Sequence, residues 1–314
     1  MIIVTGAAGF IGSVLARALN DGGHADLVLV DDFSDPAKKK NWENKKYAEL
    51  VDLWKFEDWL SANSSKVSFI FHLGANSSTV VFDKKIFDRH NLDYSKMLWN
   101  FATGNKIPMV YASSAATYGS GENGYSDDHA TLASLKPLNP YGQSKHNFDL
   151  WVLSQKKTPP FWTGLKFFNA YGPNEYHKRR MASVVLHSFN QIQQNGKVRL
   201  FKYGEQKRDF VYAKDIADVC IFFMENKPSS GIYNVGTGQA RTFKELAEAV
   251  FSALGKKSEI EYIDIPEDIK DKYQSFTEAN ISKLRLAGYS KPFTSLENGV
   301  NDYVINYLVP RKYF

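Results

Sequence analysis

Tyr141 and Lys145 have the residue types and the spacing, Y-x-x-x-K, for proton transfer to and from an alcohol. Pro140 favours the start of a helix just before them, and side chains four positions apart share one face of a helix. A lysine ammonium beside a phenol favours the phenolate, so we expect the pKa of Tyr141 to be lowered toward neutrality. The pattern therefore predicts Tyr141 as a general base with Lys145 beside it.

Spacing alone is weak evidence for this chemistry, because Tyr203 and Lys207 form a second pair with the same spacing. Gly204 follows Tyr203 directly in a polar stretch, which is typical of a turn. We therefore predict the first pair as the catalytic one. Ser114 follows an apolar run that reads as a strand, and it is predicted to hydrogen-bond the reacting hydroxyl at the active edge of a sheet.

A glycine-rich turn lies near the N-terminus. Gly6, Gly9 and Gly12 form G-x-x-G-x-x-G between the apolar run 2–5 and a helical pattern over 11–19. Glycines let the backbone turn tightly and approach a pyrophosphate, which the free N–H groups of a helix N-terminus attract. The position of the turn between a strand and a helix predicts a dinucleotide-binding site.

Two signals for the choice of dinucleotide disagree. Asp31 and Asp32 end the second apolar run, about 20 residues after the glycines, where a carboxylate binds the ribose hydroxyls of NAD. Lys38 and the two lysines after it could instead hold the 2′-phosphate of NADP. Residues 72–75 and Asn91 are expected to line the channel for either cofactor.

Apolar runs alternate with amphipathic stretches through the first half of the chain. The runs that predict strands are 2–5, 27–30, 67–72 and 109–112, and the helical stretches are 11–19, 52–62 and 86–104. This alternation implies an α/β fold with a Rossmann-type, doubly wound parallel sheet covered on both faces. Further along, strands are expected at 210–212 and 232–235, and helices at 215–224 and 242–254.

The less regular second half predicts a smaller substrate-binding domain that is interleaved with the first. We expect the dinucleotide-binding Rossmann domain to comprise residues 1–168, with about 213–239 and 291–308. The smaller α/β domain then comprises 169–212 with 240–290.

Composition excludes several other classes of protein. The 314 residues carry a net charge of +5 and contain neither a nucleic-acid-binding motif nor an apolar run long enough for a membrane helix. Cys220 is the only cysteine, which excludes an internal disulfide and a cysteine-based metal cluster, and no metal site is predicted. We expect an acidic small molecule as the partner, no nucleic acid and no membrane, and a cytoplasmic location.

The glycine turn, Ser114 and the pair Tyr141 and Lys145 resemble an extended short-chain dehydrogenase/reductase that modifies nucleotide sugars. Within that family, nearly the whole chain is similar to the ADP-L-glycero-D-manno-heptose 6-epimerases. The stretches that carry this resemblance are 111–119, 168–173, 177–184, 207–212, 234–238 and 273–277.

The resemblance implies an epimerisation that is redox-neutral overall. Bound NADP, with NAD as the alternative, oxidises C6″ of an ADP-heptose to a ketone and returns the hydride to the opposite face, in the synthesis of lipopolysaccharide core heptose. Tyr141 and Lys178 are then the two bases. The resemblance also implies a homo-oligomer, namely a pentamer.

Two sets of binding residues are expected. The cofactor-binding residues are Gly6, Gly9, Phe10, Ile11, Gly12, Asp31, Asp32, Lys38, Leu73, Gly74, Ala75, Asn76, Ser77, Asn91, Lys145, Ala170 and Lys178. The substrate-binding residues are Ser114, Asn169, Arg180, His187, Phe201, Lys202, Tyr203, Gly204, Arg208 and Tyr273. The chain departs from the family at Arg179 and Arg180, where the resemblance leads us to expect small residues after Lys178.

Three other functions remain open on the same fold. Nucleotide-sugar 4,6-dehydratases carry an acidic pair near the catalytic threonine, whereas Ser114 is followed here by two alanines, which disfavours elimination. A UDP-hexose 4-epimerase has a similar serine stretch and is the nearest competitor. A non-catalytic NADP-binding scaffold would be indicated if Tyr141→Phe left biological function unchanged.

Overall fold

The main sheet of the computed structural model, which describes residues 1–78, 83–265 and 275–314, has seven parallel strands in the order β10-β6-β5-β4-β1-β2-β3. They are β1 (Ile2–Thr5), β2 (Leu27–Asp31), β3 (Glu49–Asp52), β4 (Phe69–His72), β5 (Met109–Ser114), β6 (Trp162–Phe167) and β10 (Gly231–Val235). The strand order reverses beside β1, and the carboxyl ends of β1, β2 and β4 meet there. Ligands of open α/β sheets bind at such a point.

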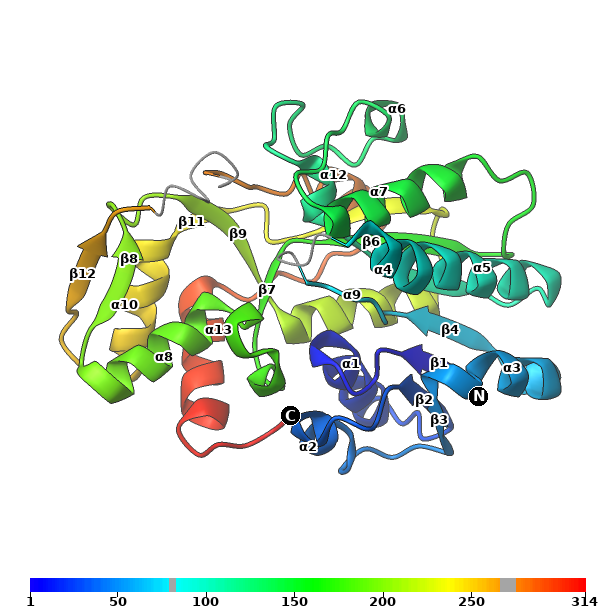
Figure 1. The fold of residues 1–314 in the computed structure, drawn as a ribbon, viewed down its shortest axis with the longest axis horizontal. Coiled ribbons are helices and arrows are strands. Elements are labelled where there is room, and N and C mark those ends of the chain that lie inside the picture. Colours follow the sequence, from blue (N-terminus) through cyan, green and yellow to red (C-terminus); the bar gives the residue numbers. More distant parts are fainter. Residues whose placement is uncertain (79–82, 266–274) are drawn as a thin grey trace.

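Helices cover both faces of this sheet, as Figure 1 shows. α1 (Phe10–Asp21) packs against α9 (Ala213–Asn226) on one face, and α5 (Tyr94–Gly104) lies beside α7 (Pro140–Leu153) on the other. The shorter helices of this part are α2 (Lys39–Trp42), α3 (Phe56–Asn63), α4 (Lys84–Phe87), α6 (His129–Leu132) and α12 (Ser282–Leu286). The predicted Rossmann-type doubly wound fold is therefore confirmed.

The sequence analysis missed two strands of this sheet, β3 and β6. β3 is an edge strand of four residues in which only Val51 is buried, so it lacks an apolar run. β6 is buried along its whole length but includes Thr163, Gly164 and Lys166, which interrupt the hydrophobic pattern. Both strands are set by neighbours in the sheet rather than by their own sequence.

A second group of elements lies beside the main sheet (Figure 1). Its strands are β7 (Asn169–Tyr171), β9 (Lys207–Tyr212) and β11 (Ala240–Thr242) in one small sheet, and β8 (Val198–Phe201) and β12 (Ile260–Ile263) in another. Its helices are α8 (Val184–Asn195), α10 (Phe243–Ala253) and α13 (Leu296–Tyr303). Thr242 and Glu245 form a capping box at the start of α10, as their spacing predicts.

The buried apolar side chains form two clusters, one for each group of elements. The division of the chain into two domains stays a prediction, and the clusters differ from it at several places. α13, which we assigned to the first domain, buries Leu296, Val300 and Tyr303 in the second cluster because it packs on α10. Leu284 and Tyr289, which we assigned to the second domain, are buried in the first cluster. Among the described residues, no helix has the length and apolar character to span a bilayer.

Candidate active site

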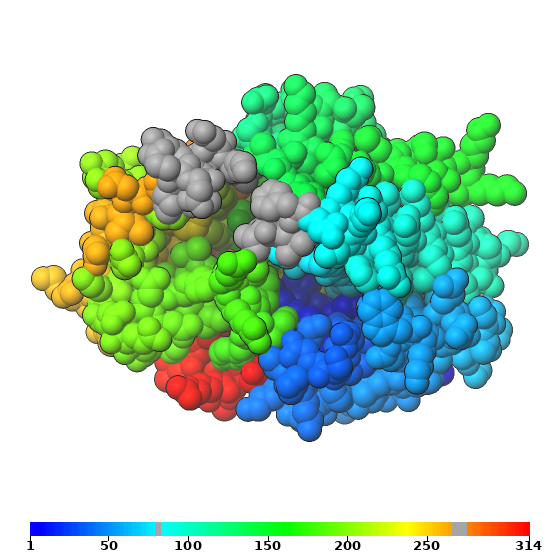
Figure 2. Space-filling view, in the orientation of Figure 1, coloured from blue at the N-terminus to red at the C-terminus, as the bar shows by residue number. Residues whose placement is uncertain are grey.

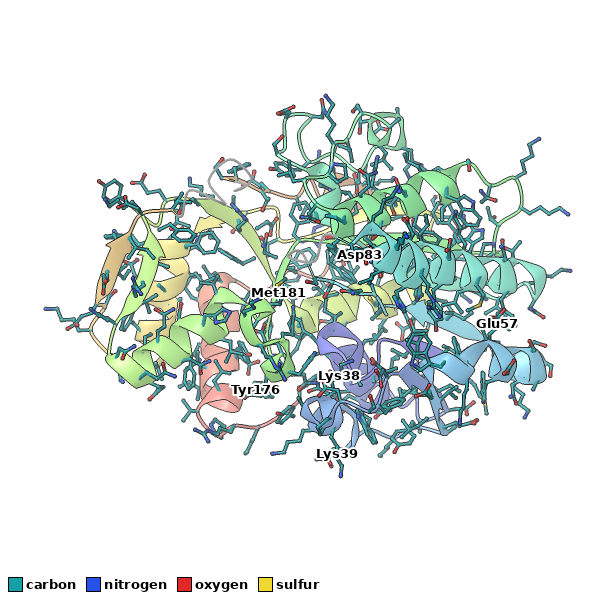
Figure 3. The ribbon with its side chains drawn as sticks, in the orientation of Figure 1. Lys38, Lys39, Glu57, Asp83, Tyr176 and Met181 are labelled. Carbon is teal, nitrogen blue, oxygen red and sulfur yellow. The ribbon has the colours of Figure 1, made fainter. Side chains whose placement is uncertain are left out.

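A cavity of about 1240 Å³ lies between the two groups of elements. It is lined by the glycine turn, the ends of β2 and β5, the loop after β4, the start of α7, and parts of the second group. Figure 2 shows the hollow, with N-terminal residues in dark blue at its floor. In Figure 3, Lys38 and Met181 mark two segments far apart in the sequence that both line it.

The glycine turn is tight, and its own backbone and that of a neighbouring loop leave no room for a side chain at Gly6 or Gly12. Gly6 has φ +71°, and a Cβ at Gly12 would lie 2.1 Å from the carbonyl oxygen of Gly6. α1 begins after Gly9 without a side-chain cap, so its first N–H groups are not satisfied by such a cap. All three glycines, with Phe10 and Ile11, line the cavity. These features fit the pyrophosphate of a dinucleotide.

The end of β2 carries an ion pair. Lys38 Nζ lies 2.9 Å from Asp31 Oδ1, and the amide of Ala8 donates to Asp31 Oδ2 at 2.9 Å. Asp32 accepts hydrogen bonds from the backbone and the hydroxyl of Ser34, which lower its pKa. Asp31, Asp32 and Lys38 all line the cavity, as predicted.

Asn41, which the sequence analysis did not single out, joins the glycine turn to the segment that bears Lys178. Its Nδ2 is 2.9 Å from the carbonyl oxygen of Ala8 and 3.1 Å from that of Asn174, and the side chain is fully buried. Asn41 Nδ2 also lies 3.2 Å from Nδ1 of His177, which lines the cavity. Burial and nearby lysines lower the pKa of His177 to about 4, so its ring is neutral at neutral pH.

The loop after β4 lines the cavity with Leu73, Gly74, Ala75, Asn76 and Ser77, as predicted. Asn91 and His72, by contrast, are buried and are not among the described lining residues, which corrects the expectation for both.

Asn91 and His72 lie behind the loop that lines the cavity. Asn91 bonds the backbone N–H and carbonyl of Asn76, at 2.8 and 2.9 Å. His72 Nδ1 is 2.8 Å from Thr5 Oγ1, which also accepts from the Gly74 amide. Asn91 and His72 therefore position the lining loop rather than facing the channel.

Tyr141, Lys145 and Ser114 come together at the cavity wall. Asn139 caps α7 through the amide of Gly142, so that Tyr141 stands in the first turn. Lys145 Nζ donates to the carbonyl oxygen of Ala112 on β5 at 2.8 Å, which fixes the helix against the strand that carries Ser114.

The pKa of Tyr141 differs from the expectation, whereas that of Lys145 is lowered. Burial lowers the pKa of Lys145 to about 8. The pKa of Tyr141 is raised by burial, although its hydrogen bond to Ser114 acts in the opposite direction. The expectation that Lys145 lowers the pKa of Tyr141 is therefore wrong for this structure, in which burial of the phenol raises it.

Lys178 reaches the same cavity from the second group of elements. It lies in the short helical segment η6 (Tyr176–Met181), and its Nζ is 5.0 Å from the centre of the Phe10 ring. Burial lowers the pKa of Lys178, while the carboxylate of Glu175 opposes the shift. Glu175 is fully buried and accepts hydrogen bonds from the amide and hydroxyl of Ser183.

Only part of the predicted substrate set lines the cavity. Ser114 and Asn169 do, and so does Ala170 of the predicted cofactor set. The remaining predicted residues that the structure describes are not among the lining residues: Arg180, His187, Phe201, Lys202, Tyr203, Gly204 and Arg208. Tyr273 lies outside the described residues.

The contacts of these residues show why they lie outside the cavity lining. Arg180 is exposed, and its carbonyl oxygen is bonded by His187 Nε2. Lys202 pairs with Asp264 at 2.8 Å, at the end of β8. The guanidinium of Arg208 packs 5.6 Å from the ring of Phe243, which does line the cavity, so Arg208 lies just behind the wall.

The sequence analysis also missed an aromatic and basic cluster at the rim of the cavity. Trp54 is 61% exposed, and its ring lies 5.6 Å from that of His90 and 5.8 Å from the guanidinium of Arg89. All three line the cavity. Trp54 follows β3, and because that strand was not predicted, no signal placed its end at this edge of the sheet.

The chain matches known proteins over nearly its whole length. Residues 2–236 match the model of the NAD dependent epimerase/dehydratase family. The chain is 47% identical to an ADP-L-glycero-D-manno-heptose-6-epimerase of Fusobacterium nucleatum and 46% identical to one of Nitratidesulfovibrio vulgaris, with 98% of each chain covered in both cases.

Solved structures show the same relationship. The ADP-L-glycero-D-manno-heptose-6-epimerase of Helicobacter pylori aligns with a TM-score of 0.83 at 31% identity, covering 97% of this chain and 95% of that one. A UDP-N-acetylglucosamine 4-epimerase from Methanobrevibacter ruminantium aligns with a TM-score of 0.85 at 25% identity, covering 99% and 98%. The chain therefore belongs to the NAD-dependent epimerase/dehydratase family and, within it, to the group of ADP-L-glycero-D-manno-heptose-6-epimerases.

Proposed function

We propose that this protein converts ADP-D-glycero-β-D-manno-heptose into ADP-L-glycero-β-D-manno-heptose by inverting C6″, a step that supplies heptose for the lipopolysaccharide core. The observation that carries the proposal is that Tyr141, Lys145 and Ser114 share one cavity with Lys178, which comes from a different part of the fold. Inversion of a carbinol carbon by oxidation and reduction needs proton transfer on two sides of that carbon. A site with two separate basic residues meets this need.

Tyr141 accepts the proton of the C6″ hydroxyl, while Ser114 holds the oxygen by a hydrogen bond. The glycine turn would hold a nicotinamide dinucleotide, which when bound would supply the hydride transfer from and back to C6″. Lys178 serves the proton transfer on that other face. The lowered pKa of Lys178 supports this role, because a lysine acts as a base only in its neutral form.

NADP is the proposed cofactor, in preference to NAD. Lys38 lies in the cavity and neutralises Asp31, so the carboxylate that would repel a 2′-phosphate is paired with a cation. The neutral ring of His177 lies near Lys38 and adds no negative charge. We therefore expect NADP to bind more tightly than NAD.

Other parts of the account come from the resemblance and stay predictions. Arg208 and Phe201 are proposed to contact the ADP part of the substrate. Assembly into a homo-oligomer, namely a pentamer, and a cytoplasmic location are also proposed. Light scattering coupled to size-exclusion chromatography measures the number of subunits directly.

The experiment is to incubate the purified protein with ADP-D-glycero-β-D-manno-heptose and to follow the configuration at C6″ by NMR. The proposal predicts conversion to an equilibrium mixture with the L-glycero epimer, and no change in UDP-glucose under the same conditions. Conversion of UDP-glucose to its C4 epimer instead, with no reaction of the heptose even with added NADP or NAD, would favour the UDP-hexose 4-epimerase.

A further inference from the structure

A fully buried ion pair lies behind the helix that carries Tyr141 and Lys145. Asp149 on α7 and Lys166 on β6 have no exposed side-chain surface, and Lys166 Nζ lies 2.6 Å from Asp149 Oδ2. Neither is among the described residues that line the cavity. Removing two charges from water is unfavourable even when they are paired, so stability alone does not explain this pair.

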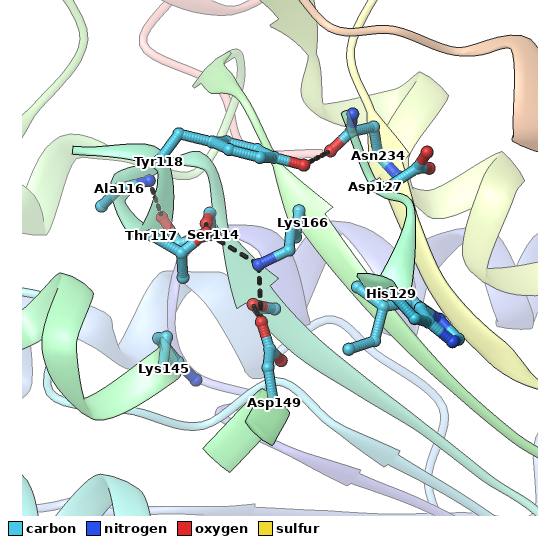
Figure 4. Close-up of polar contacts among 12 residues, drawn as sticks. Ser114, Ala116, Thr117, Tyr118, Asp127, His129, Lys145, Asp149, Lys166 and Asn234 are labelled. Atoms are coloured by element: carbon cyan, nitrogen blue, oxygen red, sulfur yellow. Dashed lines mark hydrogen bonds and ion pairs between the residues drawn. The ribbon is translucent and has the colours of Figure 1, made fainter. Parts of the chain in front are cut away.

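The pair is bonded to the strand and turn that present Ser114 (Figure 4). Asp149 Oδ2 accepts from Ser113 Oγ at 2.7 Å. Lys166 Nζ donates to Thr117 Oγ1 at 2.7 Å, and Thr117 Oγ1 donates to the carbonyl oxygen of Ser114 at 2.8 Å. One ion pair thus connects α7, β6 and both sides of the Ser114 turn.

The pair also acts on the charge of Lys145. Tyr141, Lys145 and Asp149 follow one another at intervals of four residues, which places them along one face of α7. The carboxylate of Asp149 raises the pKa of Lys145, in opposition to burial. Lys166 Nζ lies 2.6 Å from the same carboxylate and places a compensating positive charge beside it.

We propose that Asp149 and Lys166 are positioning residues for the reaction: Asp149 favours the charged form of Lys145, Lys166 limits that effect, and together the pair fixes Ser114 beside Tyr141. This inference rests on the proposed function, because it assigns a purpose to the surroundings of Tyr141 and Lys145. Asp149 and Lys166 do not line the described cavity, and they act through the residues that do.

Other titratable groups face the pair, and burial keeps each of them uncharged near neutral pH or shifts it in that direction. Burial lowers the pKa of the three histidines that face Lys145, Asp149 or Lys166, which are His72, His129 and His146. It raises the pKa of the acidic groups Tyr111, Tyr118 and Asp127. Titration between about pH 7 and pH 9 in this cluster is therefore expected to come from Lys145.

The test uses two single variants with opposite expected effects. Asp149→Asn removes the carboxylate and leaves the cation of Lys166, so Lys145 loses its proton at a pH lower by about one unit. Lys166→Met leaves the carboxylate without its partner, so Lys145 loses its proton at a pH higher by about one unit. In the double variant the two shifts largely cancel.

The pKa of Lys145 is measured by NMR titration of protein labelled with ¹³C at the lysine side chain, with the Lys145 signal assigned by its absence in Lys145→Arg. The same variants are then compared in the pH dependence of kcat, whose alkaline limb must move in the same directions. Asp302→Asn is the matched control, because Asp302 pairs with Lys214 at 2.7 Å and is not among the lining residues. It must leave both readouts unchanged.

Shifts of the same sign in both single variants, or loss of activity with no change in either pH dependence, would overturn the proposal and leave the pair a purely structural one. If Asp149→Asn does not fold, Lys166→Met and the double variant still carry the test. Lys166→Arg keeps the cation and must keep the wild-type pKa of Lys145. The NMR titration needs no substrate, so a protein that fails to epimerise the heptose disproves the proposed function without affecting this result.

Discussion

Lys38 and Asp31 form an ion pair of 2.9 Å at the end of β2, inside the cavity. From the sequence alone, Lys38 favours NADP and Asp31 favours NAD. In the structure the two residues are bonded to each other, and the carboxylate of Asp31 is satisfied by Lys38 and by the amide of Ala8. We therefore expect the preference of the site for NADP or NAD to depend on Lys38.

Lys38→Met is expected to change the preferred cofactor. Loss of the charged partner should weaken NADP binding by about tenfold to a hundredfold, while NAD binding stays within about threefold. Isothermal titration calorimetry measures both affinities. Lys39→Met is the matched control, since Lys39 is the next residue, is exposed and is not among the lining residues (Figure 3). Equal losses for both cofactors in Lys38→Met would contradict this account.

Tyr141→Phe and Lys178→Met are each expected to reduce kcat for epimerisation by about 10²-fold to 10⁴-fold, because each removes a proton-transfer group. NADP affinity should change little in Tyr141→Phe, since the hydroxyl is the only group lost. Stopped assays with NMR detection of the L-glycero epimer measure the rates. Lys244→Met, a lysine that does not line the described cavity, serves as the control. Retention of more than about a tenth of wild-type kcat in Lys178→Met would exclude that residue as the second base.

The stability of the protein in acid should depend on His72. Burial and the nearby ammonium of Lys145 lower the pKa of His72 to about 3 in the folded protein, against 6.5 for the unperturbed side chain. Between these two pH values the unfolded chain binds a proton that the folded protein does not, so stability falls as the pH drops below 6.5.

His72→Gln should lack this contribution. The free energy of unfolding of the wild type, minus that of the variant, is expected to decrease by about 1.4 kcal/mol for each pH unit below 6.5. Urea denaturation of both proteins at a series of pH values measures it. If the two proteins lose stability in parallel down to about pH 4.5, His72 is not the group responsible.

Arg179 has a backbone conformation that favours glycine, with φ +51° and ψ −124°. This is also one of the two positions where the chain departs from the small residues expected after Lys178. Arg179→Gly should therefore stabilise the protein by about 1 kcal/mol through relief of strain, partly offset by the greater freedom of glycine when unfolded. Urea denaturation measures the gain, with Arg180→Gly as the control. Equal losses of stability in both variants would show that the conformation of Arg179 is not strained.

The parts of the fold that could be predicted are those whose sequence pattern is local. β1, β2, β4 and β5 are apolar runs, and the glycine turn and Tyr141 lie in motifs that fix their own surroundings. β6 could not be predicted in this way, because Lys166 is buried there only by virtue of Asp149, 17 residues earlier.

The same limit applies to the site. Asn41 bonds to Ala8, 33 residues before it, and to Asn174, 133 residues after it, and no local pattern indicates such contacts. The places of Phe201 and Arg208 depend on how β8 and β9 are arranged beside the main sheet, which the sequence pattern does not specify. Long-range packing, rather than residue type, decides which predicted residues reach the cavity.

The central claim is that C6″ is inverted by removal of a hydride and its return within one active site. The most direct test uses ADP-D-glycero-β-D-manno-heptose carrying deuterium at C6″, incubated with the protein in ordinary water, with NMR and mass spectrometry of the product. We predict an L-glycero product that keeps its deuterium at C6″, because the same hydride leaves and returns. Inversion with replacement of the deuterium by solvent hydrogen would contradict the claim, since it would mean that C6″ loses a proton and not a hydride.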